Sequence, residues 1–218
     1  LLTNPTFHAG GTAIVQKSFD PAETLRLLSE EATAFFGVAS VYLFLSQHPD
    51  FDKMEFRRMR SWSAGGAPIP TSLLQRYLDR GIEIQYGFGM TETGPTVFLI
   101  EKEYPRTKIG SVGKPQLHVA TRIVDRAGRD VADGERGELL IKGPGLTPGY
   151  WQLPEITAQS IEDGWLHSGD VAVRVRPQSE LDPAARWGEL LRAPAVALRP
   201  AAPFTAPLGR WAVVQRGH

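Results

Sequence analysis

The sequence predicts an α/β protein in which a helix-flanked β-sheet is followed by a smaller, β-rich and barrel-like part. Three observations predict this fold class. Strand and helix patterns alternate over about the first hundred residues, the apolar period becomes two after Lys108, and two glycine-rich turns follow expected strands. Alternating units indicate a parallel sheet covered by helices, whereas an apolar period of two indicates antiparallel strands.

The first part contains clear start and stop signals. GTAIVQ at 11–16 predicts a short strand. Asp20 and Pro21 then predict a helix start, with Asp20 as N-cap and Glu23 three residues further on. Further strands are expected at 33–38, 60–64 and 82–86, and further helices at 41–47 and at 70–80, where Gly81 ends the helix.

The second part reads as antiparallel strands at 119–125 and 137–142, joined by the turn DRAGRD. The predicted boundaries are therefore 1–105 for a partial α/β subdomain and 106–172 for a β-rich subdomain. The remaining 173–218 are rich in arginine, alanine and proline and contain no lysine. Because proline interrupts helices and central strands, we expect this tail to be poorly ordered.

Composition excludes several classes of function. The 218 residues are 42% hydrophobic and 22% charged, as in globular proteins, and the 24 basic and 24 acidic side chains give no charge that favours nucleic acid. The absence of cysteine excludes disulfides, thiolate zinc sites and cysteine nucleophiles. No apolar run suits a membrane span, and the first residues lack a signal peptide, so a cytoplasmic location is expected. Since the first methionine is Met54, we also expect sequence upstream of Leu1.

The segment QYGFGMTETGP at 85–95 carries the strongest chemical signal. Its glycines let the backbone approach a ligand closely, and Phe88 offers a flat face to a base or an acyl chain. Thr91 offers a hydroxyl for a phosphate oxygen, and Glu92 offers a carboxylate suited to magnesium. Taken alone, such a segment can also be an ordinary turn.

Two further segments suit a nucleotide. SAGGAP at 63–68 places small residues after a strand, where a planar ring can lie against the backbone. DGWLHSGD at 163–170 places Asp170 after a glycine, where it can accept both hydroxyls of a ribose. Taken alone, each can also be an ordinary turn, with Asp170 as a turn acid.

In order, FHAGG, SAGGAP, YGFGMTETG, GELLIKGPG with GYW, and DGWLHSGD resemble the adenylate-forming (AMP-binding) superfamily. That superfamily comprises acyl-CoA synthetases, aryl-CoA ligases, luciferases and peptide-synthetase adenylation domains. The resemblance covers residues 1 to about 172 and is closest to bacterial medium- or long-chain fatty-acid CoA ligases. It implies that both folded parts belong to the large N-terminal domain of such an enzyme. The implied ligands are ATP, Mg²⁺, coenzyme A and a medium- or long-chain fatty acid, with neither nucleic acid nor a membrane as partner.

The resemblance also implies roles for individual residues. Glu92 would hold magnesium and Thr91 would bind the nucleotide phosphate, while His8 would line the place where carboxylate and pantetheine arm meet; a packed loop histidine is the alternative for His8. Asp170 would hold the ribose, and the residues at 65–68 and 86–88 would enclose adenine. The implied cofactor-binding set is Gly65, Gly66, Ala67, Pro68, Tyr86, Gly87, Phe88, Gly89, Met90, Thr91 and Asp170. We expect Glu92, Thr91, Phe88, Gly66 and Asp170 to converge on one cleft.

The sequence also departs from the family pattern. The lysine-containing loop that wraps the triphosphate has no match, and the sequence after Asp170 matches neither the family's hinge nor its C-terminal lysine, as an altered reading frame would produce. Phe88 and Ser168 stand where tyrosine and threonine are common. Three functions are therefore considered: part of a fatty-acid CoA ligase, inactive as this chain alone; a catalytically dead remnant that binds nucleotide; or an adenylation domain serving a carrier protein.

Overall fold

The computed structural model describes residues 3–94, 96–100 and 108–175, and the backbone of 211–215. The chain divides into two compact units, Leu1–Tyr86 and Gly87–His218. No helix in the described ranges is both long and apolar enough to cross a membrane.

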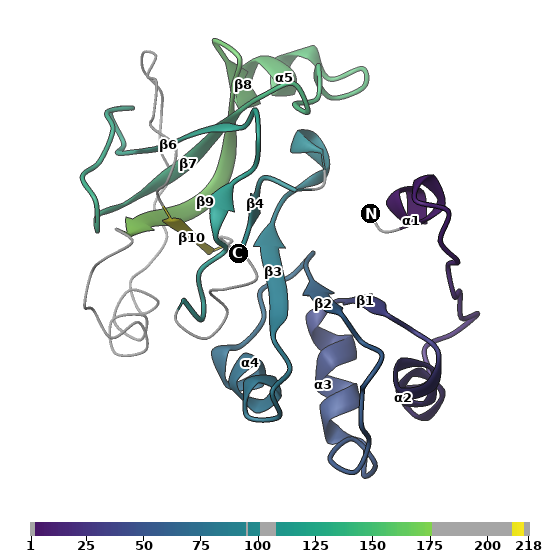
Figure 1. Ribbon diagram of the computed structural model, residues 1–218. Helices are drawn as coiled ribbons and strands as arrows, with labels where there is room; N and C mark the ends of the chain where they lie inside the picture. The colour runs from purple at the N-terminus through teal and green to yellow at the C-terminus, as the bar shows by residue number, and fades with distance from the viewer. Residues whose placement is uncertain (1–2, 95, 101–107, 176–210, 216–218) are drawn as a thin grey trace. The chain divides into compact units, whose positions relative to one another are not determined.

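The first unit is a small parallel sheet with helices. Strand β1 pairs with β2, and β2 pairs with the beginning of β3, both in parallel (Figure 1). Ala34 lies opposite Ser61, and Trp62 opposite Ile84. The elements are α1 (Thr3–His8), α2 (Pro21–Glu30), β1 (Ala34–Gly37), α3 (Ala39–Gln47), β2 (Ser61–Ala64), α4 (Thr71–Leu78) and β3 (Ile84–Phe88). The predicted alternation of strand and helix is confirmed from β1 to β3.

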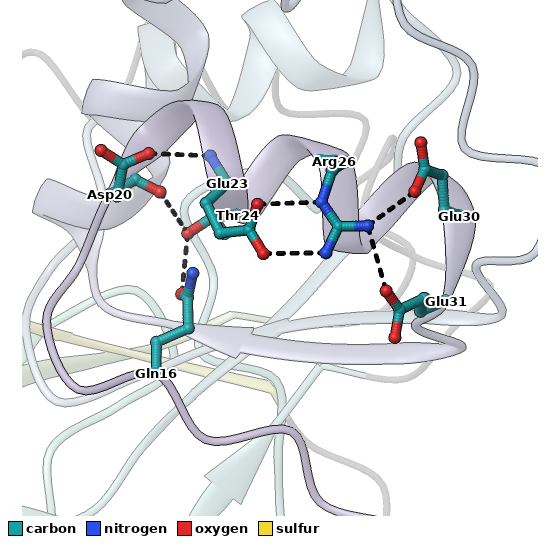
Figure 2. A network of polar contacts seen from close by, with 7 residues as sticks. All are labelled: Gln16, Asp20, Glu23, Thr24, Arg26, Glu30 and Glu31. Atoms are coloured by element: carbon teal, nitrogen blue, oxygen red, sulfur yellow. Dashed lines mark hydrogen bonds and ion pairs between the residues drawn. The ribbon is translucent and has the colours of Figure 1, made fainter.

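Helix α2 begins where the sequence predicts. The Asp20 carboxylate accepts a hydrogen bond from the backbone N–H of Glu23 at 2.8 Å, which satisfies a donor that the first turn would otherwise leave unpaired. Figure 2 shows the polar network that continues along this helix, in which Arg26 bonds three carboxylates, those of Glu23, Glu30 and Glu31. Because these groups are exposed, the ion pairs contribute little to stability.

The strand predicted at 11–16 is wrong, since these residues form no regular structure. Ile14 and Val15 are 48% and 83% exposed, and the described strands of this unit pair with one another instead. Strand formation needs a partner that satisfies the backbone, so β-propensity alone was insufficient. The side chain of Gln16 instead lies 2.9 Å from the Thr24 hydroxyl at the start of α2 (Figure 2).

Aromatic side chains packed against one another form part of the core of the first unit. The Tyr77 hydroxyl donates to the backbone carbonyl of Tyr42 at 2.7 Å, and the Tyr42 hydroxyl donates to the carbonyl of Ser63 at 2.9 Å. The two tyrosine rings meet edge to face, with centroids 5.2 Å apart. Burial raises the pKa of Tyr42 well above its ordinary value. These bonds join α3, α4 and β2.

The second unit is antiparallel. One sheet has the order β10-β9-β7-β6, and the end of β3 pairs with β4, which pairs with β5. This confirms the predicted β-rich part. Its elements are η1 (Thr91–Thr93), β4 (Phe98–Leu99), β5 (Lys114–Pro115), β6 (Ala120–Val124), β7 (Arg136–Lys142), α5 (Pro154–Ser160), β8 (Ile161–Glu162), β9 (Trp165–Val175) and β10 (Trp211–Gln215).

The predicted DRAGRD turn leads from β6 toward β7. The Asp125 carboxylate accepts from the backbone N–H groups of Ala127 and Arg129, at 2.8 and 3.0 Å. The Arg122 side chain, 4% exposed, pairs with Asp130 at 2.9 Å. A buried guanidinium must be paired, so this contact fixes the turn against the sheet.

One apolar cluster joins the strands of the second unit. It draws residues from the segments around β3, β4, β6, β7 and β9: Phe88, Val97, Phe98, Ile123, Leu139, Ile141 and Ala172. At Gly87, a Cβ atom would overlap the carbonyl oxygen of Phe98 on the neighbouring strand. Strand packing is therefore sufficient by itself to require this glycine.

Two predicted boundaries remain predictions. The boundary between 105 and 106 falls in 101–107, outside the described residues, whereas the two compact units meet between Tyr86 and Gly87. Within the predicted tail, residues 173–175 belong to β9, and 211–215 form β10. The expected poor order of the rest of the tail concerns residues outside the described ranges.

Candidate active site

The segment after β3 turns sharply at a short 3₁₀ helix. Thr93 is buried, and its hydroxyl contacts the backbone carbonyls of Met90 and Gly94, each at 3.1 Å. Gly94 has φ +69°, a left-handed conformation that favours glycine. These contacts leave Thr91 exposed and Glu92 half-buried on the short helix.

Glu92 is bonded to a distant tyrosine. The Tyr150 hydroxyl donates to Glu92 Oε1 at 3.1 Å, and the backbone N–H of Thr147 donates to the carbonyl of Glu92 at 2.6 Å. Burial, followed by the hydrogen bond to Glu92, raises the pKa of Tyr150. The hydroxyl therefore remains a proton donor at neutral pH and orients the carboxylate.

Tyr150 is itself anchored to α5. Its backbone N–H donates to the Thr157 hydroxyl at 2.9 Å, and that hydroxyl donates to the carbonyl of Leu153 at 2.9 Å. A Cβ at Gly149 would lie 2.6 Å from the Thr157 methyl carbon, so glycine is needed there. The Glu92 carboxylate is thus held by a chain of contacts that runs to a helix.

Phe88 lies in the core of the second unit. Its side chain is 8% exposed, and its ring centroid is 6.1 Å from that of Phe98. Gly89 and Met90 are half-buried. The predicted contact of the Phe88 ring with a base or an acyl chain stays a prediction. Most of the ring is covered by other side chains of the protein.

Asp170 lies in β9 at a bulge opposite Leu139 and is 6% exposed. The Ser168 hydroxyl donates to the Leu139 carbonyl at 2.7 Å. Since Leu139 and Phe88 share the apolar cluster, the segments that carry Phe88 and Asp170 meet at the same core.

The other candidates belong to the first unit. His8 ends α1 and is exposed. The turn at 65–68 follows β2; Gly65 is half-buried, Gly66, Ala67 and Pro68 are exposed, and Gly66 has φ +86°. Tyr86 is buried at the end of that unit. The predicted convergence of Gly66 with the four second-unit residues stays a prediction.

The predicted magnesium ligand is a single carboxylate, that of Glu92. In the described part of the chain, no group of three or more histidine and acidic side chains could hold a metal ion, and Glu92 has no cationic partner there. Nucleotide-bound magnesium commonly takes one or two protein carboxylates, and phosphates and water complete its shell. Glu92 therefore fits magnesium that arrives with a nucleotide.

Two residues that bond the predicted site segments were not predicted from the sequence. Tyr150 lies 58 positions from Glu92, and the motif GYW gave no sign of that contact. Glu138 was read only as part of an alternating strand, although its carboxylate bonds the segment around Asp170. A polar residue at an inward position of GELLIK was the available signal.

Residues 1–151 match the sequence profile of the family described as AMP-binding enzyme. The chain belongs to the AMP-binding enzyme family. A feruloyl-CoA synthase of Amycolatopsis sp is 41% identical to it over 169 residues, and a medium/long-chain-fatty-acid–CoA ligase, FadD8 of Mycobacterium tuberculosis, is 34% identical over 171 residues. Each match covers 77% of this chain, but 34% and 30% of the respective relative. The chain therefore spans about a third of those proteins.

Solved structures confirm the predicted fold class. ATP-bound MatB from Rhodopseudomonas palustris superposes with a TM-score of 0.74 at 30% identity, covering 79% of this chain and 34% of MatB. The N-terminal domain of FACL13 from Mycobacterium tuberculosis gives 0.67 at 29% identity, covering 75% of this chain and 42% of that one. The amide bond synthetase McbA from Marinactinospora thermotolerans gives 0.72 at 29% identity, covering 79% and 36%. The chain thus corresponds to part of an N-terminal domain of this family.

Proposed function

We propose that this chain is the part of an ATP-dependent acyl-CoA ligase that binds the nucleotide portion of the acyl adenylate. The family match over residues 1–151 carries the proposal. Two carboxylate residues of one compact unit support it. Glu92 accepts a hydrogen bond from the Tyr150 hydroxyl, and Asp170 lies in the bulge of β9. A nucleotide needs both a cation ligand for its phosphates and an acceptor for its ribose hydroxyls.

In the proposed reaction, a carboxylate attacks the α-phosphate of ATP, pyrophosphate leaves, and the thiol of coenzyme A then displaces AMP. Two unit negative charges 4 Å apart repel by about 4 kcal/mol at an effective dielectric constant near 20, so the anions need counter-charge and hydrogen-bond donors. The exposed Thr91 hydroxyl would donate to a phosphate oxygen. Glu92 would hold magnesium, which when bound neutralises phosphate charge.

Other residues would bind the remaining parts of the ligands. Asp170 would accept the ribose hydroxyls, and the turn at 65–68 would lie against adenine through its backbone, as would 86–88. His8, exposed at the end of α1, would contact the acyl carboxylate and the pantetheine arm of coenzyme A. Because Phe88 is largely buried, its backbone rather than its ring would meet the base.

The class of carboxylic acid that the enzyme would activate is a separate proposal. The resemblance favours a medium- or long-chain fatty acid, as in the 34% identical FadD8. The 41% identical feruloyl-CoA synthase favours an aromatic acid, and this higher identity makes aromatic acids the second candidate class. A panel of both acid types, assayed with a full-length homologue of this chain, separates them.

The same binding residues would serve a remnant that binds nucleotide without turnover, or an enzyme with another acceptor. McbA, an amide bond synthetase, is a structural relative with a different product. Coenzyme A, a carrier protein and an amine as acceptors for a full-length homologue distinguish these cases.

The decisive experiment measures AMP binding to the 218-residue chain by titration calorimetry, together with its Mg²⁺-dependent binding of ATP. We expect saturable AMP binding that Asp170→Ala weakens, and ATP binding whose Mg²⁺ dependence disappears in Glu92→Ala. Glu155→Ala, which removes an exposed carboxylate of α5, is the matched control and should change neither. Failure of the unsubstituted, folded chain to bind AMP would refute the proposed function.

A further inference from the structure

Strand β9 bulges where it carries Asp170. Glu138 lies opposite Val171, whereas Leu140 lies opposite His167, so three residues of β9 at 168–170 face Leu139 alone. Gly169 has φ +72°, and a Cβ there would meet no atom within 4 Å. Backbone conformation rather than crowding therefore requires glycine in the bulge.

Four polar contacts hold this bulge. Glu138 Oε1 accepts from the backbone N–H of Gly169 at 3.3 Å, and Oε2 lies 3.0 Å from His167 Nδ1. The Ser168 hydroxyl donates to the Leu139 carbonyl at 2.7 Å and accepts from the backbone N–H of Asp170 at 3.1 Å. Ser168 and Gly169 are thus hydrogen-bonded to β7, and Asp170 is hydrogen-bonded to Ser168.

Glu138 places a carboxylate at a buried position, where it lowers stability unless it is bonded. It is 9% exposed on a strand whose following residues, Leu139, Leu140 and Ile141, are all apolar and buried. A buried carboxylate destabilises a fold unless its oxygens are bonded. Both oxygens of Glu138 are bonded, one to the backbone N–H of Gly169 in the bulge and the other to the side chain of His167, which directly precedes the bulge. The observed use of this carboxylate is therefore to shape the segment that presents Asp170.

We propose that Glu138 and Ser168 are positioning residues that fix the β9 bulge so that the Asp170 carboxylate meets the ribose hydroxyls of the nucleotide. This inference rests on the proposed ribose role of Asp170. Hydrogen bonds to a ribose diol require a carboxylate of fixed direction, and a backbone held at 168–170 supplies that direction before the ligand arrives. Glu138 and Ser168 act through Asp170 and do not touch the nucleotide.

The experiment compares AMP with 2′,3′-dideoxy-AMP, which lacks the ribose hydroxyls, by titration calorimetry of the 218-residue chain. We expect AMP to bind about tenfold more tightly than the dideoxy nucleotide, the effect of hydrogen bonds to a charged group. Asp170→Ala should bring this ratio close to one, and Glu138→Ala and Ser168→Ala should each do the same. Glu138→Gln keeps the side-chain oxygen that accepts from the backbone N–H of Gly169, and Ser168→Thr keeps the hydroxyl, so both variants should preserve the ratio.

Glu135→Ala is the matched control, because it removes a carboxylate that accepts a backbone N–H, that of Ala132, outside the bulge. Its ratio should equal that of the unsubstituted chain. A merely structural role of Glu138 would weaken both nucleotides equally and leave the ratio at about tenfold, as would disruption anywhere else in the unit. If Glu138→Ala does not fold, Ser168→Ala decides the question.

The possible failures are distinguishable. If Asp170→Ala loses the preference for AMP but Glu138→Ala and Ser168→Ala retain it, the positioning role is refuted and the proposed function stands. If Asp170→Ala itself retains the preference, the ribose role of Asp170 is wrong, and the inference is wrong with it.

Discussion

Replacing Gly87 by alanine distinguishes a glycine required by strand packing from one required by a ligand. The new Cβ would lie closer than 3.0 Å to the Phe98 carbonyl oxygen, a separation that real Cβ atoms essentially never show. Strand β4 must therefore move, although Phe98 is completely buried and paired with Phe88. The substitution thus strains both the ladder and the core.

The expected cost follows from these contacts. Overpacking a core costs about 1–3 kcal/mol, and one weakened ladder hydrogen bond adds about 1 kcal/mol. The lower entropy of the unfolded alanine chain offsets about 0.5 kcal/mol. The net expectation for Gly87→Ala is a loss of about 1.5–3.5 kcal/mol, a large fraction of a typical unfolding free energy of about 5–15 kcal/mol.

Urea unfolding followed by circular dichroism measures this loss, with Gly65→Ala as the matched control. The nearest atom to a Cβ at Gly65 is a ring carbon of Phe36 at 3.4 Å, an ordinary contact, so stability should stay within about 0.5 kcal/mol. Gly65→Ala should instead weaken AMP binding. A stability loss below about 1 kcal/mol for Gly87→Ala would refute the packing argument.

Three further predictions concern the site, pH and activity. Tyr150→Phe and Glu92→Gln should each destabilise the chain by about 1 kcal/mol, and the double variant should lose less than their sum; additive losses in urea unfolding would mean that the 3.1 Å bond contributes nothing. Because burial raises the pKa of Tyr42 above its ordinary 10.0, the unfolded chain ionises first, so stability should be full below about pH 10 and fall above it. Tyr42→Phe should flatten that fall in alkaline unfolding curves, and an unchanged slope would contradict the assignment. The 218-residue chain alone, about a third of its relatives, should show no pyrophosphate exchange with any acid of the panel. The reason is that it has no match to the lysine-containing loop that wraps the triphosphate, and each oriented donor of this kind is worth about 10²- to 10³-fold in rate. Exchange that disappears in Glu92→Ala would overturn this prediction.

Local signals in the sequence predicted local structure well. The Asp20 cap identified the start of α2, because the carboxylate and its N–H partner are three residues apart. GELLIK identified β7, although Gly137–Ile141 are all buried, so that both faces of this strand are covered and burial does not alternate along it. In such cases the residues that decide the structure lie within one turn or one strand.

The sequence could not predict contacts that the fold makes between distant segments. Val15 has high β-propensity, yet 11–16 forms no strand, because a partner strand cannot be inferred from propensity. The Glu92–Tyr150 bond joins a turn to a loop that precedes α5, and no period connects them. For the same reason Glu138 was recognised as a strand residue while its bonds to the bulge were not.

The hairpin of β6 and β7 also determines when the bulge can form. Its turn is closed by local bonds, such as that from the Arg129 backbone N–H to the Asp125 carboxylate, so its loop-closure entropy is small and it should form early in folding. The bulge needs Ser168 to reach Leu139, 29 positions away, and therefore forms on a template that already exists. Loosening the bulge should then accelerate unfolding and leave the folding rate almost unchanged. We therefore expect the part of the chain that presents Asp170 to be among the last to form in folding and among the first to be lost in unfolding.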